Sequence, residues 1–268
     1  MIWPIMLALG LWWLTTLLLL WRLRLSPTTF KFTFLTVTAI CGLAVLGFFY
    51  SLERESVIAA FIAFASALGF WAWHEAVYFL GYLSGPRPKA CPPDTNVGMR
   101  FVFGVGASLY HELAVIVTGL LMLLVSIDAA NPLAVQTFVV LWVMRWSSKM
   151  NIFFGVNNLH QEFWPEHLRY LSSYVAHGRR NFFFPVSIVT AIALAYWVFQ
   201  GYGPATDPLF ELTAVTLAMT LLVLACLEHV FLLVKVPDHL LWQLGAPVVP
   251  SGRVSARASL VNPGQGKS

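Results

Sequence analysis

Charge is scarce in this sequence. Only 10% of the 268 residues are charged, whereas 59% are hydrophobic, and soluble domains carry about 25% charged residues. A chain with so little charge cannot cover a water-exposed surface, which excludes a soluble globular protein and predicts an integral membrane protein. The pI near 9.1 would suggest a nucleic-acid partner in a soluble protein. We expect none here, because basic residues in a membrane protein set its orientation.

Cysteine is also rare. Cys41 and Cys226 lie in apolar segments, Cys91 lies in a loop, and no CxxC spacing occurs. This pattern suggests neither a disulfide framework nor a thiolate metal site.

Long apolar runs are abundant. A spanning helix needs about 20 mostly apolar residues, and seven segments qualify: 2–21, 32–50, 57–83, 101–127, 133–150, 182–200 and 210–234. The predicted fold is therefore all-α, a seven-transmembrane-helix bundle over residues 1–249 with a flexible cytoplasmic tail over 250–268. The first segment has no basic residue before it and no cleavage site after it, so we expect a retained helix. The last segment has no lysine that could hold a retinal Schiff base.

Lysine and arginine are distributed unevenly along the chain. Of the 16 basic residues, all except Arg54 lie in every second connection between segments, at the end of the fifth segment or after the last segment. The two at the end of the fifth segment are Arg145 and Lys149. Cytoplasmic connections are enriched in such residues, so we expect the N-terminus outside and the C-terminus in the cytoplasm. Pro165 followed by Glu166 predicts a helix that begins there and lies along the cytoplasmic membrane surface.

Three pairs of adjacent histidine and glutamate interrupt the apolar segments. They are His74-Glu75, His111-Glu112 and Glu228-His229, and at about 1.5 Å per helical residue all three lie roughly 9–16 Å from the cytoplasmic edge. Ionisable residues inside a membrane are costly and mark functional sites. We therefore predict a cytoplasm-side chamber lined by these six residues. Its predicted floor is formed by Asn158, His160, Glu162 and His167.

Three roles are open for this chamber. Histidine and carboxylate ligands suit zinc or iron, and the candidate metal ligands are His74, His111, His160, Glu162, His167 and His229. A neutral imidazole could instead hold the magnesium of a chlorophyll, and the candidate cofactor contacts are then His74, Glu75, His111, Glu112, Asn158, Glu228 and His229. The pairs could also bind one another, or Arg145 and Lys149, only to hold the bundle together. Neither the HExxH zinc motif nor a desaturase-type histidine box occurs.

Three elements of the sequence together point to one family. They are WHE at 73–75 leading into GPRPKACP, HEL at 111–113, and the stretch from NIFFGVNNLHQEFWPEHLRYL to NFFFPVS. In these elements the chain resembles the PuhE-type family of photosynthetic complex assembly proteins of purple phototrophic bacteria. The family is named for a gene cluster around the reaction-centre H subunit. The resemblance covers about 71–236 and implies no reaction and no catalytic residues.

This resemblance implies an assembly factor in the bacterial inner (intracytoplasmic) membrane. Its implied partners are the lipid bilayer, reaction-centre or light-harvesting subunits, and pigment-synthesis enzymes, and its implied task is to handle or regulate bacteriochlorophyll supply. The residues alone leave an alternative open, a metal-dependent oxidoreductase or hydrolase that acts on a lipid-soluble tetrapyrrole, quinone or isoprenoid.

Overall fold

The structure is a computed structural model that describes residues 2–23, 25–157, 165–176, 181–203 and 206–234. These residues form seven α-helices and no β-strand. The α-helices are α1 (Ile2–Leu23), α2 (Phe30–Ser51), α3 (Val57–Phe79), α4 (Val97–Val125), α5 (Leu133–Phe154), α6 (Phe184–Gln200) and α7 (Pro208–Leu233). Two 3-10 helices, η1 (Pro27–Thr29) and η3 (Glu166–Tyr174), lie in the connections. The predicted tail over 250–268 is outside the described residues.

Five helices, α1, α2, α3, α4 and α7, are long and apolar enough to cross a membrane. This confirms an all-helical, multi-pass membrane protein. The other two are less apolar or shorter: α5 carries Arg145 and Lys149, and α6 has 17 residues. A total of seven spans therefore stays a prediction.

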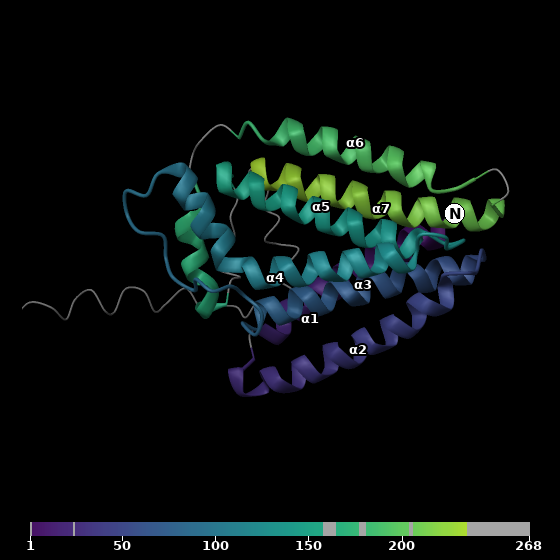
Figure 1. Ribbon diagram of the computed structural model, residues 1–268, viewed down its shortest axis with the longest axis horizontal. Helices are drawn as coiled ribbons and strands as arrows, with labels where there is room; N and C mark the ends of the chain where they lie inside the picture. The colour runs from purple at the N-terminus through teal and green to yellow at the C-terminus, as the bar shows by residue number, and fades with distance from the viewer. Residues whose placement is uncertain (1, 24, 158–164, 177–180, 204–205, 235–268) are drawn as a thin grey trace, which may run out of the picture.

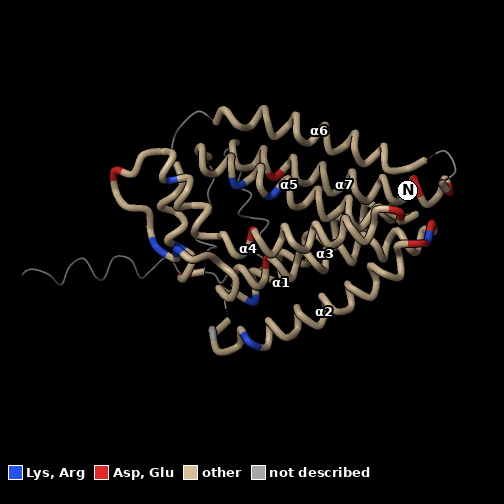
Figure 2. The backbone as a smooth tube through the Cα atoms, viewed as in Figure 1, with Lys and Arg blue, Asp and Glu red and all other residues tan. Residues whose placement is uncertain are grey.

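The seven α-helices lie side by side along the long axis of the molecule, so that successive connections alternate between its two ends (Figure 1). Figure 2 shows that charge differs between these ends. One end holds the connections 52–56 and 126–132 and the described residues 201–203 and 206–207. These carry acidic residues and a single basic residue, Arg54. Most basic residues of the described connections lie at the other end.

Arg145 and Lys149 require a correction to the charge count. We counted both with the basic residues that face the cytoplasm, but both are paired with glutamates of neighbouring helices. Because their charge is already paired within the protein, they are poor indicators of orientation. The remaining loop residues still show the same bias, and the orientation of the bundle in the membrane stays a prediction.

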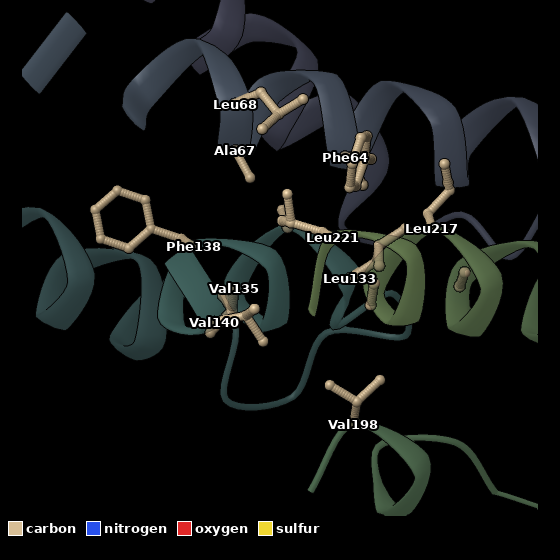
Figure 3. Packing of buried hydrophobic residues seen from close by; sticks show 14 of the residues in the cluster. Phe64, Ala67, Leu68, Leu133, Val135, Phe138, Val140, Val198, Leu217 and Leu221 are labelled. Carbon is tan, nitrogen blue, oxygen red and sulfur yellow. The ribbon is translucent and has the colours of Figure 1, made fainter. Parts of the chain in front are cut away.

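The apolar core lies between α3, α5 and α7, with α6 packed outside α5 and α7. Figure 3 shows Phe64 and Leu68 of α3 facing Phe138 of α5 and Leu221 of α7. Phe64 and Phe138 are fully buried. The three helices thus form the centre of the bundle, while α2 packs mainly on α3.

Small residues allow α2 and α3 to approach closely. A Cβ atom on Gly47 would lie 2.5 Å from Oγ of Ser66, and one on Gly69 would lie 2.8 Å from Cβ of Ala44. Lipid offers no hydrophobic driving force between helices, so such close backbone packing is a main source of helix association in membranes.

The end of α3 directs the following loop back onto α4. Gly81 has a φ of +82°, and the amides of Gly81 and Tyr82 donate to the carbonyls of Tyr78 and Val77, a Schellman motif that favours glycine at this position. Further along the loop, the Ser84 carbonyl accepts a hydrogen bond of 3.1 Å from the His111 amide. The loop therefore contacts α4 beside one of the histidine–glutamate pairs.

Candidate functional site

Two of the three paired glutamates bind cations from one face of α5. The Arg145 guanidinium donates from Nε and Nη2 to the two carboxylate oxygens of Glu75, at 3.2 and 3.1 Å. One turn further along α5, Lys149 forms an ion pair with Glu112 of α4. Residues four apart lie on one helix face, so Arg145 and Lys149 together link α3 and α4 to α5. The structure thus contains the bundle-holding pairs that the sequence left open.

The histidines of the first two pairs lie close to each other. The rings of His74 and His111 are 6.3 Å apart between centroids, and both residues are buried. Nε2 of His111 lies 3.9 Å from Oε1 of Glu75, and Nε2 of His74 lies 3.0 Å from Oγ1 of Thr118. Neither Nδ1 atom has a hydrogen-bond partner among the described residues.

The third pair is split between two environments. His229 points toward α5, because its Nε2 lies 3.0 Å from Oγ of Ser147. Its Nδ1 donates to the carbonyl of Ala225, one turn earlier in α7, at 2.7 Å. Ser147 in turn donates to Ser187 of α6, which also accepts from Asn151. This buried polar network joins α5, α6 and α7. Adjacent helix residues point about 100° apart, and Glu228 instead faces a cavity.

The cavity measures about 610 Å³ and lies between α1, α3, α4, α5, α7 and η3. Its charged lining residues are Glu112, Arg145, Lys149 and Glu228. The other residues that line it are largely apolar or aromatic, including Trp12, Tyr78, Phe79, Phe101, Trp146, Phe153, Tyr174 and Phe231. The cavity is therefore an apolar chamber with a few charged groups on its wall.

One side of the cavity is lined by η3, which contributes Leu168, Leu171 and Tyr174. The predicted surface helix is thus present as a 3-10 helix that begins at Glu166, and it lies across the end of the bundle (Figure 1). The loop after α3 holds it in place, because the Tyr174 hydroxyl donates to the Lys89 carbonyl at 2.6 Å and accepts from Arg87. Burial raises the pKa of Tyr174, and the Arg87 guanidinium opposes part of this rise.

The predicted chamber residues are distributed over several places. Glu112 and Glu228 line the main cavity, whereas His74 lines a second cavity of about 320 Å³ between α2, α3 and α4. Glu75, His111 and His229 line neither. His167 packs against Gly81, where an added Cβ would lie 3.0 Å from its Nε2. Asn158, His160 and Glu162 lie outside the described residues.

No group of three or more histidine, cysteine, aspartate or glutamate side chains that could hold a metal ion occurs within the described part of the chain. The predicted metal set includes His160 and Glu162, which are not described, so the hypothesis stays a prediction. Sequence reasoning missed Trp12, Tyr78 and Trp146 as cavity residues. Aromatic residues are frequent throughout the chain, and the sequence offers no signal that separates those on the cavity wall from the rest.

From the sequence, Arg145 and Lys149 were counted among the cytoplasmic basic residues and considered as possible partners of the glutamates, but they were not predicted to line a cavity, and both do. Their spacing did carry a signal. Two cations four residues apart in an otherwise apolar helix lie on one face and need partners inside a membrane.

Comparison with known proteins places the chain among relatives without a described activity. An "Uncharacterized 30.4 kDa protein in puhA 5'region" from Rhodobacter capsulatus is 34% identical over 244 residues, which is 89% of this chain and 88% of that protein. No solved structure matches the chain. The model of the DUF3623 family, whose description is "Protein of unknown function", matches residues 1–251. The chain therefore belongs to the DUF3623 family.

Proposed function

We propose that this protein is a membrane assembly factor for the photosynthetic reaction-centre and light-harvesting complex, and that it holds a lipid-soluble ligand in the main cavity. The observation that carries the proposal is the cavity itself. Its volume of about 610 Å³ is within the usual range for small-molecule sites, about 300–1,000 Å³. Its wall combines apolar and aromatic side chains with few polar groups, as ligand sites do.

The context of the relative supports the photosynthetic part of the proposal. The similar protein of Rhodobacter capsulatus is described as lying in the 5′ region of puhA. The PuhE-type resemblance links this kind of gene cluster to the reaction-centre H subunit. Bacteriochlorophyll or a precursor is therefore the ligand that we propose, with reaction-centre or light-harvesting subunits or pigment-synthesis enzymes as partners.

The proposed setting is a bacterial inner membrane, crossed seven times, with the N-terminus outside and the C-terminus in the cytoplasm. The charged residues of α5 are compatible with crossing, because Arg145 and Lys149 are paired with Glu75 and Glu112. The 17 residues of α6 span about 25 Å at 1.5 Å per residue, a little less than a typical hydrocarbon core of about 30 Å. The basic residues gathered in the connections at one end of the bundle support the proposed orientation.

The proposal is tested by filling the cavity. Ser148 lines the cavity, and Ser148→Trp adds bulk there without removing a charge. The variant and the wild type are purified from a phototrophic bacterium, and the bound pigments and lipids are extracted and identified. We expect the wild type to carry pigment or precursor at a fixed ratio and Ser148→Trp to lose it.

Val223→Trp is the matched control, because Val223 of α7 is 59% exposed on the outside of the bundle. Equal pigment in Ser148→Trp and the wild type would contradict the proposal. Metal analysis of the same preparations tests the alternative enzyme. Stoichiometric iron or zinc that is lost in His111→Ala would favour a metal-dependent reaction over ligand delivery.

A further inference from the structure

Among the described residues, three carboxylates lie at the cavity or are paired with its wall, against two cations. Glu75 is paired with Arg145, and Glu112 is paired with Lys149. For Glu228, no lysine, arginine or histidine nitrogen of the described residues lies within 4.0 Å. Arg145 is close enough to influence Glu228 electrostatically, but two of its nitrogens are held by Glu75. Within the described part of the chain, the Glu228 carboxylate therefore has the weakest cationic pairing of the three.

Glu228 is also the most accessible of the three carboxylates. Its side chain is exposed and lines the cavity, whereas the side chains of Glu75 and Glu112 are 12% and 6% exposed. Among the described residues, its side-chain hydrogen-bond partner is Trp12 of α1, which lines the same cavity. Indole has one donor, so carboxylate lone pairs remain for a further partner.

A carboxylate in this position favours one kind of ligand. Each ionisable group inside a membrane costs a few kcal/mol unless it is paired, and hydrogen bonds to a charged acceptor are shorter and stronger than neutral ones. A ligand with a carboxylate or phosphate would meet an excess of negative charge, because Arg145 and Lys149 already bind glutamates. A cationic or hydrogen-bond-donating group would instead complete the pairing of Glu228.

We infer that Glu228 selects amphiphilic ligands that carry a cationic or hydrogen-bond-donating group, while the aromatic wall of the cavity binds their apolar body. The inference rests on the proposed function, since it names the chemical class of the ligand for the same cavity. It assigns Glu228 as the residue that determines specificity. The Trp12 indole positions its carboxylate.

Matched probes test the inference. Three probes are titrated into the purified full-length protein in non-ionic detergent. Each probe is an eighteen-carbon chain that carries a nitroxide quencher, and the probes differ only in their head group, which is an amine, an alcohol or a carboxylic acid. Quenching of tryptophan fluorescence reports binding, since Trp12 and Trp146 line the cavity. The pH is set between the ordinary pKa values of a carboxylic acid and an alkylamine. We expect the amine to bind at least about tenfold more tightly than the acid, since hydrogen bonds to charged groups contribute about 1.5–3 kcal/mol.

Glu228→Gln removes the charge and keeps the shape of the side chain. We expect it to abolish the preference for the amine and to weaken binding of the alcohol to a smaller extent, because an amide oxygen still accepts a hydrogen bond but carries no charge. Glu211→Gln, in the first turn of the same helix and outside the cavity, should change neither. A preference for the acid, or a preference for the amine that survives in Glu228→Gln, would overturn the inference while the proposed function stands. Quenching that is absent or unaffected by Ser148→Trp would mean that the cavity binds no ligand, and the proposed function would then fail as well.

Discussion

The ion pair between Glu75 and Arg145 gives the strongest prediction about stability. Arg145→Met keeps an unbranched apolar stem and removes the guanidinium, so that Glu75 loses both of its hydrogen bonds of 3.1–3.2 Å. The Glu75 side chain is only 12% exposed, and water can therefore replace few of the lost contacts. Removing one partner of a buried pair costs about 3–5 kcal/mol of unfolding free energy, and we expect a loss in this range.

A double variant separates the cost of losing the ion pair from the cost of leaving a buried charge unpaired. In Glu75→Gln combined with Arg145→Met no uncompensated charge remains, so we expect the double variant to recover at least about half of the loss. Neighbours in one ion pair couple by about 0.5–3 kcal/mol in a double-mutant cycle. Lys31→Met, on the exposed face of α2, is the control for loss of a cation, and it should change stability by no more than about 0.5 kcal/mol.

The stabilities of the wild type, Arg145→Met, Glu75→Gln, the double variant and Lys31→Met are measured by unfolding the purified proteins in mixed micelles. Tryptophan fluorescence follows the unfolding as the fraction of denaturing detergent rises. The reasoning would be refuted if Arg145→Met cost no more than Lys31→Met. It would also be refuted if the two single changes were additive, because the pair would then contribute nothing beyond its separate side chains.

Two further predictions concern packing and polar contacts. Gly85→Ala should lower the midpoint of thermal unfolding, because the added Cβ would lie 2.7 Å from the Ala107 carbonyl carbon and 2.8 Å from the Leu109 amide nitrogen, and such overpacking costs about 1–3 kcal/mol. Gly98→Ala is the control and should be tolerated, since the nearest atom to its added Cβ would lie at 3.5 Å. Equal midpoints for the two variants would contradict the packing. Gln136→Leu should cost about 1–3 kcal/mol in the same assay, because buried Gln136 donates to the Val198 carbonyl and accepts from the Tyr202 hydroxyl. Combining it with Tyr202→Phe should then add little, and a fully additive loss would show that the two side chains act independently.

The helices were predictable because a membrane imposes a simple requirement. About 20 apolar residues are needed to cross it, and each predicted segment overlaps one observed helix over most of its length, for example 133–150 against Leu133–Phe154. Helix ends were less predictable. The end of α3 depends on Gly81 and its left-handed backbone, so the helix stops at Phe79 although the apolar pattern continues to 83.

The site was only partly predictable, because depth can be read from residue number but direction around a helix axis depends on packing. Glu228 and His229 share a depth, yet one lines a cavity and the other joins a polar network with Ser147. The sequence also suggested Arg145 as a possible partner for the glutamates. Its choice of Glu75 rather than Glu112 follows from how α3 and α4 lie against α5, which composition does not reveal.

The pairing of α5 also bears on how the chain enters the membrane. On its own α5 is less apolar than the five helices that could span a bilayer, and its two cations would oppose insertion. Both partner carboxylates, Glu75 and Glu112, lie earlier in the chain, so a ribosome that makes this protein completes α3 and α4 before α5 emerges. If α5 crosses the bilayer as proposed, the earlier helices can neutralise it as it arrives, and its insertion then depends on the order of synthesis.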